Sequence, residues 1–368
     1  MNIKSLLLGS AAALVAVSGA RAADAVMAEP EAVEYVRVCD AYGAGFFYIP
    51  GTETCLKISG RVRYQIDYDS TSFSYQDLNG NNSYDVGEPT SNGWRKNASA
   101  MLNVTAKSDT ELGTLTSYIE LSAGRNSGTG LAINVVESPV GSGNFIETIN
   151  GYWGLDHAWI SLGGLKMGFS DTLYDGGLDG EGAKGGGGGI HFMSYTFTSG
   201  SVSATLALEE DTYDVNYVPN VVGKVSWTMA PVGVDVWVAY DDDDTLVGAS
   251  DAGWSAKARL SADVGTSGKL KVLGSYNSNN NFYANGGTWT IGASYAHTFS
   301  PKLTLTGLVQ YQGDTNFGAA GAPNNIVFGG VVDYTIVPDF SAKLAVWHNT
   351  NGAAPGSTNA FLRFQRSF

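Results

Sequence analysis

Apolar and polar side chains alternate with a period of two along most of the chain. In residues 56–68, apolar side chains at alternate positions are separated by polar ones such as Lys57, Arg61 and Arg63. This alternation is typical of a β-strand with one apolar and one polar face. No helical pattern of comparable strength occurs, and residues 25–37 are the only weak helical candidate. The chain is therefore expected to be almost entirely β.

Sixteen alternating segments follow one another, and short connections between them alternate with long polar ones such as residues 70–93, 125–154 and 172–190. This arrangement is expected of an up-and-down barrel with both ends on the periplasmic side, whereas a soluble β-sandwich gives no reason for it. We predict an all-β fold, a 16-stranded antiparallel transmembrane β-barrel with short periplasmic turns and long extracellular loops. The predicted strands are residues 56–69, 94–107, 113–124, 155–163, 165–171, 191–198, 201–209, 220–229, 232–241, 253–263, 268–276, 288–299, 302–312, 325–336, 339–348 and 359–368.

Aromatic residues lie near the ends of the apolar strand faces, and the chain ends in Phe368 on an alternating strand. Aromatic side chains at such positions are typical of the interfacial girdles of membrane barrels. Aromatic residues also favour strands in general, which is the alternative explanation. The girdle candidates are Tyr64, Tyr68, Trp94, Tyr240, Tyr276, Trp289, Phe299, Tyr311 and Tyr334.

Residues 1–22 have the features of a secretory signal peptide that is removed. Lys4 precedes a short apolar run, and a small-x-small cleavage pattern ends at Ala22. No later stretch of 18 apolar residues occurs, which excludes a helical inner-membrane protein. We therefore divide the chain into this signal, an N-terminal segment (residues 23–55) and the barrel (residues 56–368).

The charge of the chain argues against a nucleic-acid partner. Lys and Arg number 21 against 35 Asp and Glu, a net charge of −14. Removing Lys4 and Arg21 with the signal leaves 19 basic residues and a net charge of −16. A basic nucleic-acid-binding surface is not expected at this charge.

Cys39 and Cys55 are the only cysteines. An exported chain enters an oxidising compartment, where such a pair usually closes into a disulfide. A zinc site is a weaker alternative, because no histidine lies near them and two ligands do not make such a site.

Two segments resemble the alphaproteobacterial porin family. The first is residues 38–60, VCDAYGAGFFYIPGTETCLKISG, and the second is residues 361–368, FLRFQRSF, which is similar to that family's end. The resemblance implies a trimeric, sixteen-stranded general diffusion porin in the bacterial outer membrane that passes small hydrophilic solutes. It also implies that the loop after the fifth strand folds into the lumen.

Basic residues on the polar strand faces are candidates for the wall of a pore constriction. A charge facing lipid at mid-depth would cost about 2–4 kcal/mol, so these residues are expected to point inward. Arg61 and Arg63 lie mid-strand, where a constriction is expected. The alternative is that they are solvated charges in a wide lumen without a selective role. The predicted basic wall is Lys57, Arg61, Arg63 and Arg95.

The third long loop carries four acids followed by a run of glycines, residues 185–189. Glycine allows sharp turns in a confined space, and the acids would face the arginines across the lumen. The alternative is a loose outer loop. A phosphate loop is poorly supported, because neither Ser nor Thr follows Lys184 and the glycine spacing does not match. The predicted acidic side of the constriction is Asp171, Asp175, Asp179 and Glu181.

The first long loop has the oxygen-ligand spacing of a calcium-binding loop, with ligands at Asp77, Asn79, Asn81, Asp85 and Glu88. It departs from that pattern at Asn82, where glycine is usual, and no helices flank it. A polar, turn-rich surface loop is the alternative. No cofactor is expected apart from this structural calcium.

Catalysis finds little support, because the four histidines form no recognisable motif and G-x-S-x-G and H-E-x-x-H are absent. We expect the protein to have no enzymatic activity. We expect it to form a homotrimer that contacts outer-membrane lipid and lipopolysaccharide. The alternatives are a substrate-selective channel, for example for sugars, with Trp159 and Trp347 as inward aromatic candidates, and a structural or adhesive barrel with a blocked lumen. The net charge of −16 favours cations if it acts on the pore.

Overall fold

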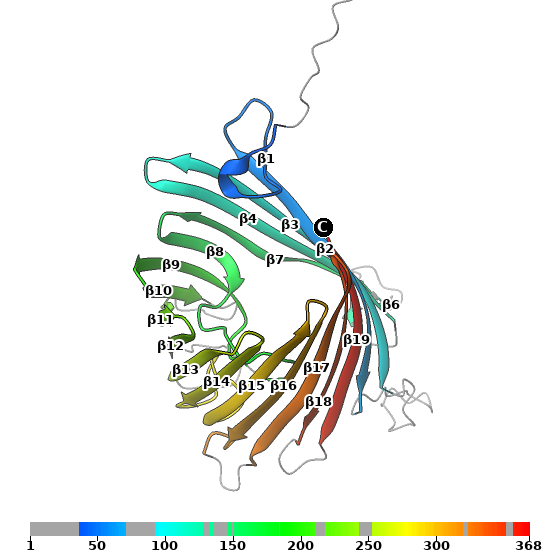
Figure 1. Cartoon of the computed structure of the whole chain (residues 1–368). Helices are drawn as coiled ribbons and strands as arrows, with labels where there is room; N and C mark the ends of the chain where they lie inside the picture. The colour runs from blue at the N-terminus through cyan, green and yellow to red at the C-terminus, as the bar shows by residue number, and fades with distance from the viewer. Residues whose placement is uncertain are drawn as a thin grey trace, which may run out of the picture. The chain divides into compact units, whose positions relative to one another are not determined.

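The alternating segments pair edge to edge in the computed structural model, forming an antiparallel sheet that closes on itself (Figure 1). The structure describes residues 37–70, 93–127, 133–135, 146–148, 151–183, 185–210, 218–242, 252–318, 323–350 and 356–368. Val38–Phe368 form one compact unit, to which this description applies. In the described part of the chain, no helix has the length and apolar character needed to cross a membrane.

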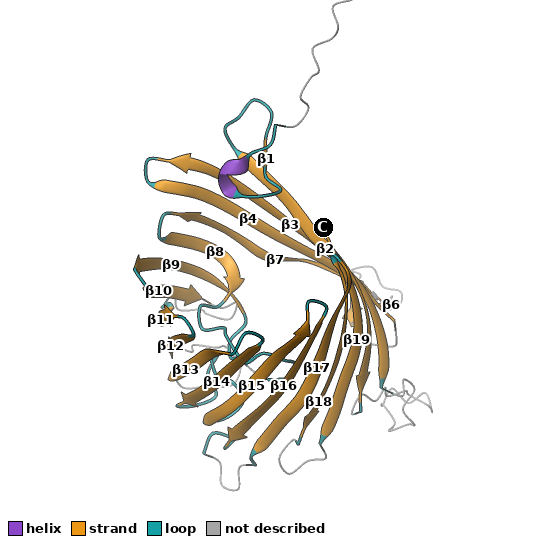
Figure 2. Cartoon of the chain, viewed as in Figure 1, coloured by secondary structure: helices purple, strands orange, loops and turns teal. Residues whose placement is uncertain are grey.

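Strands make up nearly all of the regular structure (Figure 2). One short 3-10 turn, η1, spans Asp40–Tyr42. The strands are β1 (Phe47–Tyr48), β2 (Cys55–Asp69), β3 (Trp94–Thr110), β4 (Gly113–Ser127), β5 (Ile133–Val135), β6 (Ile146–Thr148), β7 (Gly151–Leu162), β8 (Leu165–Asp171), β9 (Gly189–Ser199), β10 (Val202–Glu210), β11 (Asn220–Met229), β12 (Val232–Asp241), β13 (Gly253–Val264), β14 (Gly268–Asn277), β15 (Trp289–Ser300), β16 (Leu303–Gly313), β17 (Asn325–Val337), β18 (Phe340–Asn349) and β19 (Ser357–Ser367).

Sixteen strands form the barrel wall, and each pairs with its neighbours in chain order. The sequence runs from β2 through β3, β4 and β7 to β19, and pairing of β19 with β2 closes the ring. β1 adds only a two-residue pairing to β2, and β5 and β6 form a separate hairpin. The prediction of a sixteen-stranded antiparallel barrel is therefore confirmed. The three short strands β1, β5 and β6 were not predicted from the sequence.

The apolar face of each strand is exposed and the polar face is covered. This is the reverse of the arrangement in a soluble protein, where the apolar face is buried. On β16, Leu305 and Val309 are exposed, whereas Gln310 and Gln312 are fully or almost fully buried. An exposed apolar belt around a closed sheet is the expected surface of a barrel in lipid. Outward aromatic pairs also link neighbouring strands near their loop ends, and these are Tyr68–Trp94, Trp254–Tyr276 and Trp289–Tyr311.

Tight turns join strands at one end of the barrel. Gly163 and Gly200 adopt φ angles of 58° and 57° there, a left-handed conformation that glycine enters without the steric cost of a Cβ. Asp339 adopts φ 61° in the turn between β17 and β18. Aspartate is one of the few other residues that tolerate this conformation.

The predicted Cys39–Cys55 disulfide is present, with a Cα–Cα distance of 6.0 Å. Both cysteines are buried, and Phe46, Tyr42 and Tyr48 pack around them in the segment that precedes the barrel. This bond ties the N-terminal segment to the first residue of β2. The C-terminal residue pairs with the same strand, because Phe368 and Gly60 of β2 exchange backbone hydrogen bonds of 2.9 and 3.0 Å.

Candidate pore constriction

The loop between β8 and β9, residues 172–188, folds against the inner wall of the barrel. Its first two residues bind Glu209 on β10, since Thr172 Oγ1 donates to Oε2 at 2.5 Å and the Leu173 amide donates to Oε1 at 2.7 Å. Glu209 has 1% of its surface exposed. A buried carboxylate needs such donors, so the start of the loop is fixed to the wall.

Cations from β13 hold the middle of the loop. Lys257 donates to the carbonyl oxygens of Tyr174 and Gly185, and its ammonium lies 4.7 Å from the centre of the Trp237 ring. Arg259 donates to the Gly177 carbonyl at 3.1 Å. The outgoing arm of the loop and its returning arm are thus both bound to β13.

The tip of the loop reaches strands β14 to β18. Asp179 forms an ion pair of 2.5 Å with Lys271, and its amide donates to Ser294 Oγ at 2.9 Å. Glu181 Oε1 lies 3.5 Å from Lys343 Nζ. Two acids of the predicted acidic side are therefore partnered by lysines that were not among the predicted wall residues.

A second loop, residues 278–288 between β14 and β15, also folds inward and covers the first. Tyr283 is fully buried and donates from its hydroxyl to Glu209 Oε2 at 3.0 Å. Its ring packs edge-on against Tyr174 with centroids 5.4 Å apart. The predicted strands leave a long polar connection here, but its inward course was not predicted from the sequence.

Three arginines line a cavity of about 260 Å³ on the wall formed by β2, β17, β18 and β19. Arg63 donates from Nε and Nη2 to Gln365 Oε1 at 3.2 and 2.9 Å, and Arg363 donates from Nε to Gln65 Oε1 at 2.5 Å. Arg61 lines the same cavity. Lys343, Asp333 and Ser341 complete the polar lining.

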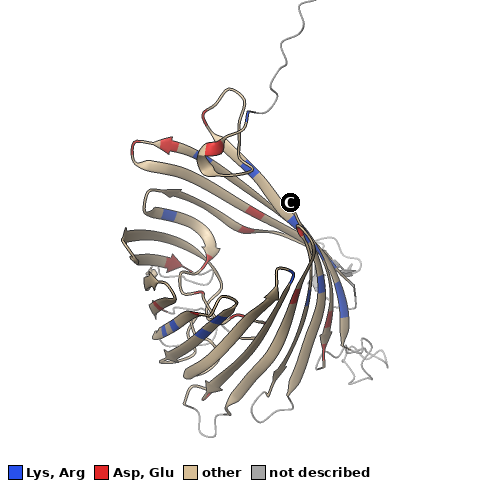
Figure 3. Ribbon diagram, in the orientation of Figure 1, with Lys and Arg blue, Asp and Glu red and all other residues tan. Residues whose placement is uncertain are grey.

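The other predicted residues lie away from this cluster. Lys57 donates to the Ala44 carbonyl at 3.3 Å, beside the N-terminal segment. Arg95 is exposed near the opposite end of the wall. It pairs in register with Asp67 on β2, and Asp67 lies four residues along that strand from Arg63, a separation of about 13 Å. Figure 3 shows that basic positions are spread over several strands of the wall.

At the loop's base, Asp171 Oδ2 lies 4.0 Å from His157 Nε2, and Asp175 accepts a 2.7 Å hydrogen bond from the Gly176 amide. Neither contact involves an arginine of the cluster. The calcium candidates, Asp77, Asn79, Asn81, Asp85 and Glu88, and the predicted signal, residues 1–22, lie outside the described residues.

Sequence reasoning missed Glu209, Tyr283 and the role of Arg363. A closed barrel places the last predicted strand beside the first, but the sequence does not show the register that brings Arg363 to Gln65. Glu209 had a detectable signal, because it occupies the inner phase next to Glu210 at a strand end. Nothing local in the sequence identifies Tyr283 as a lumen residue.

Comparison with known proteins agrees with this architecture. Residues 24–361 match a family described as the Porin subfamily. The chain is 36% identical to Porin Omp2b of Brucella neotomae and of Brucella abortus (strain 2308), with 100% of both chains covered in each case.

Solved channel structures share the fold. The outer membrane channel DcaP of Acinetobacter baumannii aligns with a TM-score of 0.65 at 14% identity, covering 87% of this chain and 99% of that chain. A mutant porin of Rh. blastica aligns with a TM-score of 0.53 at 12% identity, covering 85% and 100%. Because the family match spans most of the chain and the Brucella porins align with all of it, this protein belongs to the porin family and is a diffusion channel of the bacterial outer membrane.

Proposed function

We propose that the channel passes small hydrophilic solutes with a preference for anions, and that Arg61, Arg63 and Arg363 set this preference. One observation carries the proposal. In the part of the chain that the structure describes, none of the three guanidiniums has a carboxylate oxygen within 4.0 Å.

The hydrogen-bond partners of Arg63 and Arg363 favour this interpretation. Both guanidiniums are oriented by neutral glutamine oxygens, so their direction is fixed without an ion pair. The acids of the loop tip, in contrast, form ion pairs, Asp179 with Lys271 and Glu181 with Lys343, which also pairs with Asp333. A lining with one uncompensated sign raises the local concentration of the opposite ion.

The net negative charge of the chain supports the opposite selectivity. Charges in solution are screened over about 8–10 Å at physiological ionic strength, so acids on distant loops act weakly on a permeating ion. Charges that line the narrow part of a pore act at contact distance. Local arginines therefore outweigh the total charge in this proposal.

The test is the reversal potential of purified channels in a planar bilayer under a salt gradient. Replacing Arg61 and Arg63 together by Gln should move selectivity toward cations. Arg95→Gln is the matched control, because it removes one inward-facing arginine that lies outside the cluster. A reversal potential unchanged by the double substitution, or shifted equally by the control, would contradict the proposal.

A sugar-selective channel is less well supported by the geometry. Trp347 packs under the loop at Gly182, and Trp159 stacks on Tyr118 with centroids 5.1 Å apart. These tryptophans belong to β18 and β7, which are not neighbours in the wall. They do not form one row along which a sugar ring would slide. A structural barrel with a blocked lumen would give no stable conductance from folded protein.

We include association into a homotrimer in this proposal. An apolar groove on the outer face is lined by residues of β2, β3, β4 and β7, among them Val62, Leu102 and Leu121. Trp153, which also lines this groove, has 87% of its surface exposed. A second barrel would cover this patch more closely than lipid chains. Trp153→Ala should weaken the trimer band of unheated protein in gel electrophoresis.

Lipopolysaccharide is the other partner that we propose. Arg125 on β4 is exposed and pairs in register with Ala98, which itself faces Tyr64 on the outer surface. A cation at the lipid-facing rim is placed to meet lipid phosphates. Arg125→Gln should lower the amount of lipopolysaccharide that co-purifies with the protein.

A further inference from the structure

One carboxylate joins the two lumen loops. Glu209 Oε2 accepts hydrogen bonds from Thr172 Oγ1 of residues 172–188 and from the Tyr283 hydroxyl of residues 278–288, at 2.5 and 3.0 Å. The second oxygen, Oε1, accepts the Leu173 amide. Both carboxylate oxygens are therefore used, and the two loops meet on a single wall residue.

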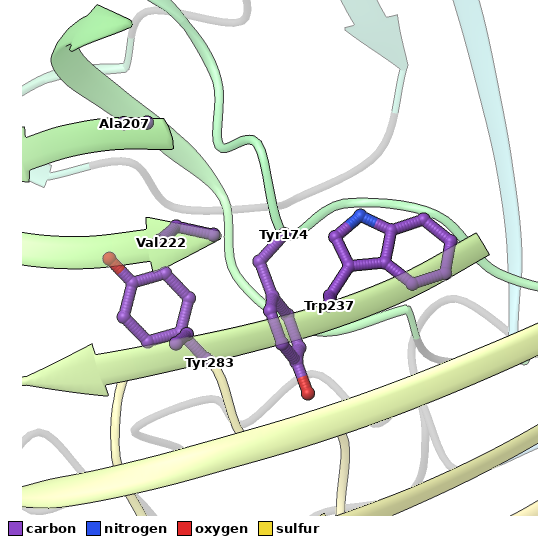
Figure 4. Packing of buried hydrophobic residues seen from close by; sticks show 6 residues of the cluster. Tyr174, Ala207, Val222, Trp237 and Tyr283 are labelled. Atoms are coloured by element: carbon purple, nitrogen blue, oxygen red, sulfur yellow. The ribbon is translucent and has the colours of Figure 1, made fainter. Parts of the chain in front are cut away.

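The contact between the loops is also apolar. Tyr174, Trp237 and Tyr283 are fully buried and pack with Ala207 and Val222 in one cluster (Figure 4). A Cβ added to Gly186 would overlap the Tyr283 carbonyl oxygen. The returning arm of the first loop thus lies directly against the second loop, with no space for a larger residue.

The second loop is itself fixed to the wall. The Phe282 amide donates to Asp241 Oδ2 at 2.7 Å, and within the loop the Tyr283 amide donates to Asn281 Oδ1 at 3.0 Å. Asn285 Oδ1 accepts from Ser275 Oγ at 2.9 Å and from Asn277 Nδ2 at 3.1 Å. These bonds reach strands β12 and β14. Residues 278–288 therefore form a support that does not depend on the first loop.

The constriction loop needs such a support. Residues 172–188 contain eight glycines, and glycine loses more conformational freedom on ordering than any other residue. Without long-range contacts, a segment of this composition samples many conformations. Its position in the lumen must then come from the residues that bind it.

We propose that residues 278–288 act as a clamp on the constriction loop, and that Tyr283 and Glu209 are positioning residues that hold the channel in its open state. Tyr283 secures the base of the loop through Glu209 and Tyr174. The tip, with Asp179 and Glu181, is bound separately by lysines. Loosening the base lets the loop move across the lumen, so brief closures become more frequent. The proposal rests on the established channel function and does not require anion preference.

The direct test is single-channel recording of Tyr283→Phe, which removes only the hydroxyl. Loss of one hydrogen bond worth about 1.4 kcal/mol corresponds to about a tenfold change in the ratio of closed to open time. We expect that increase, with the reversal potential unchanged because the arginine cluster is intact. The matched control is Tyr276→Phe, a tyrosine on β14 whose side chain is exposed on the outer face.

Thr172→Val provides a second variant, because it removes the other hydroxyl from the same oxygen of Glu209. It should raise closures in the same way, and the double variant with Tyr283→Phe should fall short of the product of the two single effects. A merely structural defect would lower heat resistance without changing the closure rate.

Wild-type closure rates in both folded single variants would overturn the clamp. Increased closures in the Tyr276 control, equal to those of Tyr283→Phe, would overturn it as well. A failure of the anion proposal appears in the reversal potential instead, so the two results are distinguishable.

Discussion

Arg63 on β2 and Gln365 on β19 face each other in register, and two nitrogens of the guanidinium share the one amide oxygen. The two residues are 302 positions apart in the chain. A neutral acceptor fixes the direction of the guanidinium and leaves its charge available to solutes. The same position with a carboxylate would make an ion pair, and the effect on permeating ions would be lost.

Gln365→Glu tests this relationship. The substitution keeps the shape of the side chain and adds one negative charge within hydrogen-bond distance of Arg63. We expect the reversal potential to move toward cations, in the same direction as the arginine substitutions, with little change in conductance at high salt. Gln65→Glu should act similarly through Arg363. A shift toward anions in either variant would contradict the role of the cluster.

The pair Asp179–Lys271 predicts two opposite shifts. Asp179→Asn leaves Lys271 uncompensated and should increase anion preference. Lys271→Met leaves Asp179 uncompensated and should decrease it. Because both side chains are largely buried, with exposed fractions of 33% and 18%, solvent does not screen them fully. Equal reversal potentials in the two variants would show that the pair lies away from the ion path.

Gly182 at the loop tip predicts a steric effect on conductance. Its φ is 86°, and an added Cβ would overlap the indole of Trp347. Gly182→Ala should displace the tip and change the single-channel conductance, with a backbone cost of about 1–2 kcal/mol. Gly188→Ala is the matched control in the same loop, because nothing lies within 4 Å of its added Cβ. Identical conductance in the two variants would contradict this prediction.

The calcium-like spacing in residues 77–88 remains a prediction from the sequence. Isothermal titration of the purified protein should show calcium binding in the millimolar range or tighter, the upper end being about that of extracellular calcium-binding modules. Asp77→Asn and Glu88→Gln together should abolish it. Absence of heat at millimolar calcium would remove the hypothesis and favour a simple polar loop.

Much of the barrel could be predicted because strand signals are local. Residues 220–229 and 232–241 were predicted from alternation alone, and β11 and β12 have the same bounds. β7 begins at Gly151, whereas the predicted strand began at residue 155. The prediction began too late because Gly151 and Gly154 interrupt the alternation. The constriction loop was expected to fold inward from the family resemblance, and its contacts with Lys257 and Lys271 agree with that expectation.

The partners within the lumen could not be predicted in the same way. Asp179 and Lys271 are 92 residues apart, and Glu181 and Lys343 are 162 residues apart. Strand phase shows that such residues face inward, but not which of them meet. The acids were expected opposite the arginines, whereas at Asp179 and Glu181 they pair with lysines of the wall along which the loop lies.

The sequence by itself determined the number of strands, the face that each presents to lipid and the disulfide. These features follow from a period of two, from the alternation of turn lengths and from two cysteines in an oxidising compartment. Only the tertiary structure decided which charges are compensated and that a second loop enters the lumen. Those outcomes depend on contacts between distant segments, such as Tyr283 with Glu209, and no local pattern encodes them.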